Sequence, residues 1–301
     1  MFNQLGVVGC GLMGGSFALA LKRAGLVKHV VGYSKSPSTT ELARRMGVID
    51  VAAESALLAV SGSDIVLLAV PVSATEATLA AIRLVLQADV LLMDVGSTKR
   101  DVVDTARRML RDNVGCFVPC HPIAGSEQSG VAHADAALYA NRQVILTPLT
   151  QTRPELIQQA TDVWTAIGAQ VLRMTPENHD GAFAAVSHLP HLLAFAYFSA
   201  INNQPAGRDY LSLAGPGFRD FTRIAASDPS IWRDILLANR EEVLKQSQRF
   251  RFALDSLELA MLAGNGQALE DLIRTPAQAR SGWQIGGGAR GPGGSDGASD
   301  T

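Results

Sequence analysis

The chain has 301 residues, of which 47% are hydrophobic, so it is long enough to bury one large core or two smaller ones. Its 26 Lys and Arg residues nearly balance its 28 Asp and Glu residues, which argues against nucleic acid or an anionic membrane surface as partner. The three cysteines, Cys10, Cys116 and Cys120, have no CxxC spacing, which argues against a disulfide framework or a zinc site and fits a reducing compartment.

The apolar runs predict neither a signal sequence nor a membrane span. The first residues enter a strand-like run without the basic segment and apolar core of a signal sequence. The other apolar stretches are too short or too interrupted to cross a bilayer. We therefore expect a soluble, cytoplasmic protein with no membrane partner.

Short apolar strands alternate with helical segments through the first part of the chain. The strands barely alternate between apolar and polar residues, as buried strands do, and they span Leu5–Val8, His29–Tyr33, Ile65–Ala69, Val90–Asp94, Gly115–Pro119 and Gln143–Thr147. Helical patterns follow at Gly14–Ala24, Ser38–Met46, Ala74–Leu86, Lys99–Leu110 and Pro154–Ile167, and a last short strand at Gln170–Met174. This alternation predicts an α/β domain over residues 1–174, with a doubly wound, mostly parallel sheet between helices.

After residue 174 the helical pattern continues without comparable strand signals. Glu177–Ala200 is a long helical candidate interrupted by Pro190, and Asp228–Phe252 and Leu254–Leu262 carry apolar residues at core-facing spacings. We expect an all-α second domain over residues 175–280. The remainder, 281–301, becomes Gly/Ser-rich from Gly286 onward and is expected to be disordered.

The segment Gly9-Cys10-Gly11-Leu12-Met13-Gly14 is a GxGxxG element. It follows a strand and opens a helix, which is the context in which this pattern binds a dinucleotide. Gly9 permits a tight turn, Gly11 lets a pyrophosphate approach the backbone, and Gly14 allows the helix to pack closely on the strand. The free N–H groups at the helix start then bind the phosphates. The alternative is a glycine-rich turn without a ligand.

The end of the second strand carries Ser34 and Lys35, where a carboxylate usually binds the adenosine ribose of NAD. A hydroxyl and an ammonium in that place would accept a 2′-phosphate. The cofactor is therefore expected to be NADP or NAD, with a lean toward NADP or the use of both. Alternatively, both side chains face water and NAD binds through other contacts.

Three polar loops follow predicted strands, where the ligands of doubly wound sheets bind. They are Val70-Pro71-Val72, Asp94–Lys99 and the segment from Cys120 to Gly130. A nicotinamide ring at this edge would have Ser97 and His121 among its neighbours. An imidazole titrates near physiological pH, so His121 could accept a proton while a hydride leaves. The alternative for such segments is a solvated connector.

Five motifs together resemble the prephenate/arogenate (cyclohexadienyl) dehydrogenase family. They are GCGLMGGS at 9–16, DVGSTK at 94–99, HPIAGSEQSG at 121–130, SHLPH at 187–191 and GFRDFTRIAASDPSIWRD at 217–234. The resemblance implies a Rossmann-type domain followed by a helical domain that forms a homodimer. It also implies NAD(P)-dependent oxidative decarboxylation in tyrosine biosynthesis, from prephenate to 4-hydroxyphenylpyruvate or from arogenate to tyrosine.

The resemblance assigns roles to individual residues. His121 matches the base that takes the substrate's hydroxyl proton, and Ser97 matches the residue that orients this imidazole and hydrogen-bonds the hydroxyl. Arg223 matches the cation that binds a substrate carboxylate, and His191 matches a histidine beside the pyruvyl side chain. Trp232 matches an aromatic residue near the pocket, although a tryptophan on an amphipathic helix more often belongs to a core.

Several neighbouring residues have more than one interpretation. Glu127 is a candidate polar gate or a partner for Arg223, and the alternative is an exposed loop acid. Arg223 could instead form a surface pair with a nearby aspartate. His188 and His191 share a helical face, but no third ligand is evident, so no metal site is expected and His188 is assigned to packing or a domain interface.

Four more polar residues are assigned structural positions. Asp94 is expected to form a turn, and Lys99 is expected to begin a helix. His179 and Asp180 fall at the domain junction, where they could hydrogen-bond across it, without a catalytic role.

Two other functions stay open for the whole chain. A β-hydroxyacid dehydrogenase or imine reductase would have the same two-domain plan, but such enzymes typically use a lysine of the second domain. A nucleotide-sensing dimer would bind the cofactor without turnover, and it would need neither Ser97 nor His121.

Overall fold

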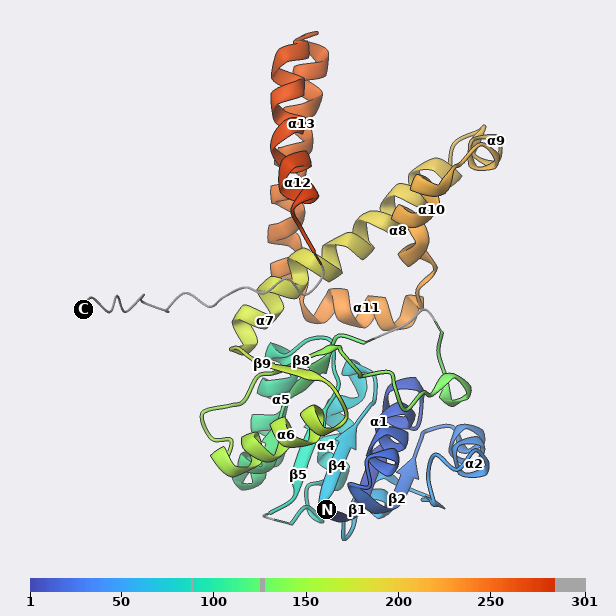
Figure 1. The fold of residues 1–301 in the computed structure, drawn as a ribbon, viewed down its shortest axis with the longest axis vertical. Helices are drawn as coiled ribbons and strands as arrows, with labels where there is room; N and C mark the ends of the chain where they lie inside the picture. Colours follow the sequence, from blue (N-terminus) through green and yellow to red (C-terminus); the bar gives the residue numbers. More distant parts are fainter. Residues whose placement is uncertain (88, 125–127, 285–301) are drawn as a thin grey trace, which may run out of the picture. The chain divides into compact units, whose positions relative to one another are not determined.

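The computed structural model describes residues 1–87, 89–124 and 128–284 (Figure 1). The chain divides into two compact units, one over residues 1–246 and one from residue 247 onward. The boundary expected near residue 174 stays a prediction. The Gly/Ser-rich tail from Gly286 lies outside the described residues.

A six-stranded parallel sheet forms the centre of the first unit. Its strands lie in the order β3-β2-β1-β4-β5-β6 and comprise β1 (Phe2–Val8), β2 (Val27–Tyr33), β3 (Val51–Ala52), β4 (Ile65–Leu68), β5 (Leu91–Asp94) and β6 (Phe117–Val118). The strand order reverses between β1 and β4, and ligands of such sheets bind at the carboxyl ends beside this switch point. The doubly wound parallel sheet predicted from the sequence is thereby confirmed.

Helices flank the sheet and bury its apolar strands (Figure 1). They are α1 (Leu12–Arg23), α2 (Pro37–Arg45), α3 (Ala56–Val60), α4 (Thr75–Ile82), α5 (Arg100–Leu110) and α6 (Pro154–Ala166), with short turns η1 (Val72–Ala74), η2 (Arg111–Cys116) and η3 (Val131–His133). The core includes an aromatic cluster, in which the Trp164 ring lies 4.8 Å from Phe17 and 5.1 Å from Tyr139. The Tyr139 hydroxyl donates to the Met13 carbonyl at 2.7 Å, so the cluster also holds the start of α1.

A second, three-stranded sheet carries the histidine motif. It consists of β7 (Cys120–Pro122), β8 (Gln143–Leu146) and β9 (Gln170–Arg173), with β7 antiparallel and β9 parallel to β8. His121 therefore lies on a strand, opposite Ile145, and the prediction that it belongs to a loop is wrong. Pro119 has no N–H to give to a ladder, and the chain changes from one sheet to the other at this residue.

The helical region begins with one continuous stretch of 27 residues. It consists of α7 (Pro176–Phe183), the π-helical segment η4 (Ala184–His188) and α8 (Leu189–Asn202). Pro190 was expected to interrupt it, but it lies in the first turn of α8, where a missing N–H is tolerated. The irregularity falls in η4 instead, and such π-helical turns are frequent at functional sites.

Five helices and a short turn complete the described chain. They are α9 (Gly207–Ser212), α10 (Pro216–Thr222), η5 (Arg223–Ala226), α11 (Pro229–Ala238), α12 (Arg240–Leu262) and α13 (Gly266–Ser281). Asp228 caps α11 by accepting the N–H groups of Ser230 and Ile231. The single helix expected over Asp228–Phe252 is wrong, because the chain breaks at Asn239 between α11 and α12.

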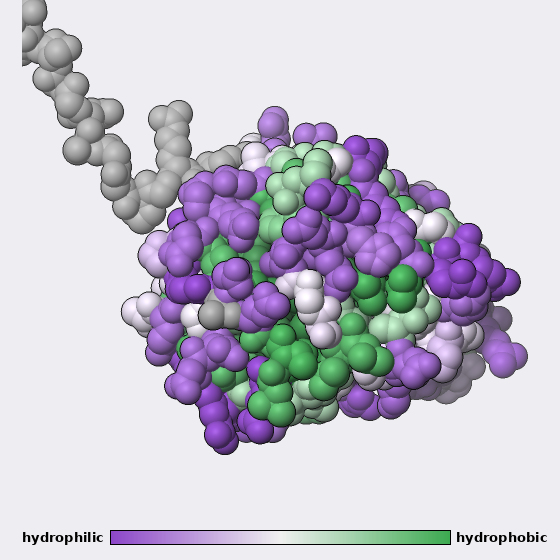
Figure 2. All heavy atoms as spheres, turned by 90° about the horizontal axis from the view of Figure 1, so that it is seen from below, coloured by the Kyte–Doolittle hydropathy of each residue, from purple (hydrophilic) through white to green (hydrophobic). Residues whose placement is uncertain are grey.

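The stretch Pro176–Asn202 is long and apolar enough to cross a membrane by length and composition, with a hydropathy of 1.3. This differs from the expectation that all apolar runs are too interrupted, because Pro190 does not break the helix. Only 22% of its apolar window is buried within the single chain. On the face of the molecule that Figure 2 draws, apolar areas are separated by hydrophilic side chains.

Candidate active site

The glycine turn between β1 and α1 leaves room for a phosphate group. Gly9 has a φ of 103°, and a Cβ there would collide with the Ala69 carbonyl. A Cβ on Gly14 would collide with the Gly9 carbonyl, whereas one on Gly11 would meet nothing within 4 Å. Leu12 and Met13 begin α1, whose first N–H groups no side chain caps. The turn is therefore closely packed at Gly9 and Gly14 and open beside Gly11. This arrangement fits a dinucleotide pyrophosphate.

Ser34 connects the end of β2 to this turn. Its Oγ accepts the Cys10 N–H at 2.8 Å, and its own N–H donates to Thr40 Oγ1 at 3.0 Å. Lys35 is exposed beside it. Across the switch point, Val70 is half-buried and Pro71 is exposed, directly after β4. These positions form the edge at which the adenosine and nicotinamide halves of a dinucleotide would bind.

A buried ion pair holds the loop after β5 against β7. Lys99 Nζ lies 2.6 Å from Asp94 Oδ2 and also donates to the Cys120 carbonyl at 2.6 Å. Asp94 further accepts the N–H groups of Gly96 and Cys120. Asp94 thus forms the expected turn, but the burial of the Lys99 side chain was not predicted. Its two strong partners fix the backbone that leads directly into His121.

His121 is hydrogen-bonded to a second histidine, which is bonded to a carboxylate. Its Nδ1 lies 2.8 Å from His179 Nε2, and His179 Nδ1 lies 2.8 Å from Asp180 Oδ1. Asp180 also accepts the backbone N–H groups of Lys99 and Arg100, at 2.9 and 3.0 Å. The Phe183 ring packs against both imidazoles, with centroids 4.8 Å from His121 and 4.5 Å from His179. The junction residues of the sequence are therefore partners of the candidate base.

The environment of His121 favours its neutral form. Burial lowers its pKa well below the ordinary value, and interaction with His179, Lys99 and His188 lowers the pKa further. The expectation that it titrates near physiological pH is therefore wrong for this structure. A neutral imidazole at physiological pH has one nitrogen lone pair available to accept a proton.

His188 is a buried donor that the sequence did not predict. Asn239 Nδ2 donates to the Asp180 carbonyl at 2.8 Å and lies 3.1 Å from His188 Nδ1. Because this amide nitrogen only donates, His188 Nδ1 accepts and its Nε2 carries the hydrogen. That Nε2 is buried without a partner among the described residues. Burial, the main cause, lowers the pKa of His188 to about 4, so it is a neutral N–H donor.

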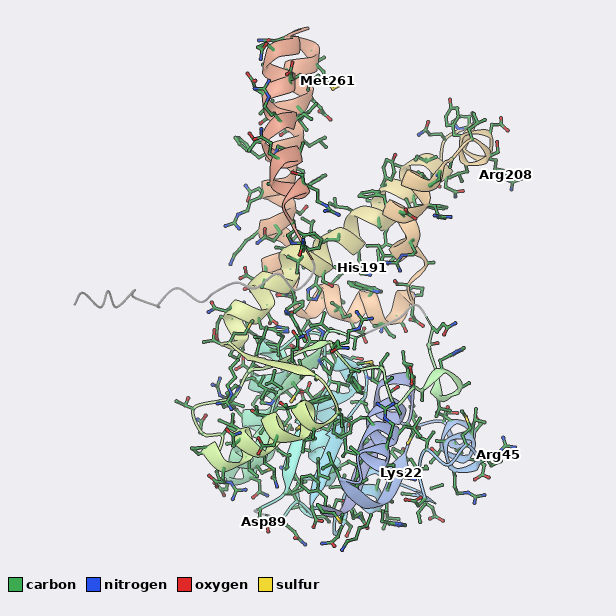
Figure 3. The ribbon with its side chains drawn as sticks, in the orientation of Figure 1. Lys22, Arg45, Asp89, His191, Arg208 and Met261 are labelled. Atoms are coloured by element: carbon green, nitrogen blue, oxygen red, sulfur yellow. The ribbon has the colours of Figure 1, made fainter. Side chains whose placement is uncertain are left out.

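His191 and Trp232 join α8 to α11. Their rings stack with centroids 3.5 Å apart and an angle of 18°, and His191 lies between the two helices (Figure 3). His191 Nδ1 is bonded to the Ser187 carbonyl at 2.9 Å. Burial lowers the pKa of His191, the bond to Ser187 opposes this, and the charge of Arg223 lowers the pKa further. Arg223, at the start of η5, therefore lies close enough to act on the same region.

The remaining predicted site residues are placed less closely together. Ser97 is half-buried in the loop after β5, but no hydrogen bond joins it to His121 among the described residues. Glu127 lies outside the described residues.

Ser73, after β4, donates to Asp234 of α11 at 2.5 Å, which brings the helix of Trp232 to the switch-point edge. Asn239 gave no recognisable signal in the sequence, since it lies in what looked like one uninterrupted helix.

Two family descriptions match consecutive parts of the chain. "Prephenate dehydrogenase, nucleotide-binding domain" matches residues 17–173, and "Prephenate dehydrogenase, dimerization domain" matches residues 175–275. The chain belongs to the prephenate dehydrogenase family. Membership confirms the resemblance, the oxidoreductase class and the use of a nicotinamide dinucleotide, while the lean toward NADP stays a prediction.

Relatives of this prephenate dehydrogenase family match nearly the whole chain. It is 34% identical over 284 residues to a prephenate dehydrogenase of Bacillus subtilis, covering 94% of this chain and 76% of the relative. It is 33% identical over 282 residues to a cyclohexadienyl dehydrogenase of Zymomonas mobilis, covering 93% of this chain and 96% of the relative. A structure of prephenate dehydrogenase from A. aeolicus in complex with hydroxyphenyl propionate and NAD+ is 36% identical in sequence, with a TM-score of 0.87. The match covers 93% of this chain and 98% of that structure's chain.

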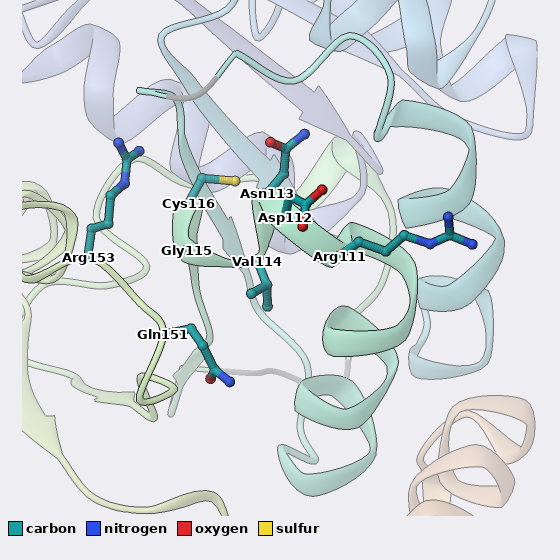
Figure 4. A pocket seen from close by; sticks show the side chains of 8 residues that line it. All are labelled: Arg111, Asp112, Asn113, Val114, Gly115, Cys116, Gln151 and Arg153. Carbon is teal, nitrogen blue, oxygen red and sulfur yellow. The ribbon is translucent and has the colours of Figure 1, made fainter.

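A cavity of about 420 Å³ lies beside the turn η2 that leads into β6 (Figure 4). Its described lining consists of Arg111, Asp112, Asn113, Val114, Gly115, Cys116, Gln151 and Arg153. None of these described residues is a site residue predicted for this member of the prephenate dehydrogenase family. We assign the cavity no part in the reaction.

Proposed function

We propose that this protein catalyses the NAD(P)-dependent oxidative decarboxylation of prephenate, arogenate or both in the cytoplasm. The products would be 4-hydroxyphenylpyruvate from prephenate and tyrosine from arogenate, as tyrosine biosynthesis requires. The observation that carries the proposal is His121, a neutral imidazole on the short strand β7, which is hydrogen-bonded to His179 and through it to Asp180. His188 acts on the pKa of His121 and contacts Trp232, whose ring stacks on His191. We propose that these rings form a polar and aromatic surface for a ring-shaped substrate.

His121 handles one proton in this reaction. A bound NAD+ or NADP+ supplies the acceptor for the hydride that leaves the hydroxyl-bearing ring carbon. His121 takes the hydroxyl proton as general base. Carbon dioxide leaves from the opposite ring carbon, and its bonding electrons complete the aromatic ring and place a negative charge on the oxygen. His121 then returns the proton to this oxygen, so that atoms and charge balance.

The other residues bind and orient the substrate. Arg223 is proposed to pair with a substrate carboxylate, which suits a guanidinium group. His191 is proposed to bind the side chain of the substrate, with its ring held against Trp232. Ser97 is proposed to hydrogen-bond the reacting hydroxyl, and Glu127, which lies outside the described residues, to act as a polar gate or as a partner for Arg223. The relatives named prephenate and cyclohexadienyl dehydrogenases support the proposal, without deciding between the two substrates.

The test is a set of initial rates for prephenate and arogenate, each with NAD+ and NADP+, followed by the absorbance of the reduced nicotinamide. Reduction with either substrate supports the proposal, and the rates rank substrates and cofactors. His121→Asn should keep the fold and cofactor binding but lower kcat by roughly 10²–10⁴-fold. Turnover of a β-hydroxyacid alone, or cofactor binding without any turnover, would contradict the proposal.

We further propose that the active form is a homodimer. The family description that matches residues 175–275 names a dimerization domain. Large apolar side chains of the helical region are exposed in the single chain, including Phe198, Leu213 and Phe221. A second copy would cover such side chains, because exposed apolar surface of this extent marks an interaction site.

A further inference from the structure

Three polar side chains form a chain of hydrogen bonds that ends at the candidate base. His121 lies on β7, and His179 and Asp180 lie on α7. The two bonds, His121 Nδ1 to His179 Nε2 and His179 Nδ1 to Asp180 Oδ1, are both 2.8 Å long. His179 and Asp180 are fully buried, so water does not compete for these positions.

The hydrogen bonds determine which nitrogen of each ring carries a hydrogen. Asp180 receives two backbone N–H groups, and the bonds from His179, Arg100 and Lys99 outweigh its burial and hold its pKa below the ordinary value. An ionised carboxylate only accepts, so His179 Nδ1 must donate to it. Neutral His179 then has its lone pair on Nε2. His121 must therefore donate from Nδ1, which leaves the lone pair of His121 on Nε2.

We infer that His179 and Asp180 are positioning residues that act through His121: they hold it in the tautomer whose Nε2 can accept a proton. The inference rests on the proposed function, in which Nε2 of His121 takes the substrate's hydroxyl proton. When that proton arrives, both nitrogens of His121 carry hydrogens. The Nδ1–H bond to His179 then becomes charge-assisted, and no second proton moves. Asp180 keeps His179 in the accepting orientation throughout.

A purely structural role does not account for the geometry. Asp180 already joins α7 to the start of α5 through the Lys99 and Arg100 N–H groups, and this needs no histidine beside it. The His179 ring instead bridges the carboxylate and His121, and Phe183 packs on both rings and keeps them in place. The same order, carboxylate to imidazole to reacting group, is used elsewhere to select a histidine tautomer.

Burial is the main cause that lowers the pKa of His121 and of His179, and the charged groups around the pair modify both values. Lys99, paired with Asp94, lowers the pKa of both His121 and His179, and His188 from η4 lowers the pKa of His121. Asp180 raises the pKa of His179. Below the pKa of His121 the base is protonated and turnover stops. Loss of the His179 acceptor should therefore shift the acidic limb of the kcat profile at pH values where the variant is still folded.

The experiment compares four variants of the full chain with the wild type. In His179→Leu the acceptor is absent, and in His179→Gln the Oε1 can accept the Nδ1–H of His121. Asp180→Asn replaces one carboxylate oxygen by an NH2 group, so that a donor faces either His179 Nδ1 or the Arg100 N–H and the hydrogen of His179 is no longer fixed on Nδ1. The control is His133→Leu, the same substitution at an exposed histidine outside the site. Each variant is measured for kcat, KM, the Kd of the cofactor and the ¹⁵N shifts of its histidine rings.

We expect the wild type to show His121 with hydrogen on Nδ1 and none on Nε2. His179→Leu and Asp180→Asn should lower kcat about 10²-fold, with KM and the cofactor Kd within about threefold of wild type. His179→Gln should recover at least about tenfold of that loss. His133→Leu should match the wild type.

Three results would overturn the inference. They are a wild-type His121 with hydrogen on Nε2, a kcat of His179→Leu equal to that of His133→Leu, and no recovery in His179→Gln although the variant folds and binds cofactor. If the wild type oxidises neither prephenate nor arogenate, the proposed function fails instead. The ring shifts still decide the hydrogen-bond arrangement in that case, because they need no substrate.

Discussion

Ser34 illustrates how one side chain can serve both the fold and the cofactor. Its Oγ accepts the Cys10 N–H and so fixes the glycine turn. The hydroxyl hydrogen is not used in that bond and can be donated to an oxygen of the adenosine ribose or of a 2′-phosphate. A carboxylate in the same place could accept from Cys10 and from the ribose hydroxyls, but it would repel a phosphate.

Ser34→Asp should therefore shift the cofactor preference toward NAD. We expect kcat/KM for NADP+ to fall by at least about tenfold relative to that for NAD+, a difference of about 1.4 kcal/mol. Measurement of kcat/KM with both cofactors in wild type and variant checks this. Lys35→Ala is the companion variant, because it removes an exposed charge without introducing a new one. An unchanged cofactor ratio in Ser34→Asp would show that the 2′ position is bound elsewhere.

At the scale of elements, the strands and helices of residues 1–174 follow from apolar runs and glycine turns, and the sequence predicted most of them. The errors fall where tertiary contacts decide. His121 lies on a strand because Asp94 and Lys99 bind the backbone of Cys120, and no local pattern shows that contact. Likewise, Asn239 ends α11 while its amide bonds Asp180 and His188, which are distant in sequence.

The candidate site, like the helices and strands, was predictable from the sequence except where tertiary contacts decide. The histidine, serine and arginine motifs stood out as polar groups in distinctive patterns, but the partners that set their chemistry did not. His179 and Asp180 come from a different element, and their distance to His121 depends on how α7 packs against β7. A sequence shows residue types in order, whereas hydrogen-bond partners depend on that packing.

The βα turn offers a matched pair of substitutions that separates folding from cofactor binding. Gly11→Ala adds a methyl group where no atom lies within 4 Å, so the protein should fold with a nearly unchanged Tm. The same methyl group would occupy the space of the pyrophosphate and should weaken cofactor binding at least about tenfold. Gly14→Ala collides with the Gly9 carbonyl and should lower Tm itself. Thermal melts and cofactor titrations test both; normal cofactor affinity in Gly11→Ala would refute the assigned phosphate position.

The stretch α7–η4–α8 should make stability depend on pH. The pKa values of His179 and His188 lie below the ordinary value of 6.5 in the folded protein. Below pH 6.5 the unfolded chain therefore binds more protons than the folded one, and the free energy of unfolding falls as pH falls. With its folded pKa of about 4, His188 alone accounts for a loss of about 2 kcal/mol at pH 5.

Urea unfolding at pH 7 and pH 5 measures this loss. His188→Leu removes the titrating group and should reduce the difference between the two pH values by about 2 kcal/mol, whatever its effect at pH 7. His133→Leu, at an exposed position, should leave the difference unchanged. Equal differences in wild type and His188→Leu would mean that His188 does not stay neutral in the fold.

For the whole molecule, the main question is what covers the apolar surface of the helical region. Tyr197 and Phe198 of α8 contact Phe218 of α10, and Tyr197 also contacts Phe221. These four residues form an aromatic cluster that remains partly exposed, with Phe221 54% exposed. The second compact unit exposes large apolar side chains of its own, among them Phe252, Leu259 and Leu262.

In the proposed homodimer a second copy of the chain packs on this apolar surface. A charged side chain in the aromatic cluster of α8 and α10 should therefore separate the two subunits. Phe221→Asp places a carboxylate where the partner would pack, and burying an unpaired charge is costly enough to shift the equilibrium toward monomers. Sedimentation velocity should show a dimer for the wild type and a smaller species for the variant. Leu84→Asp is the control, because Leu84 is 84% exposed but follows α4, outside the helical region. A wild type that sediments as a monomer would exclude the dimer. A wild-type dimer that persists in Phe221→Asp but dissociates in Leu84→Asp would place the interface outside the helical region.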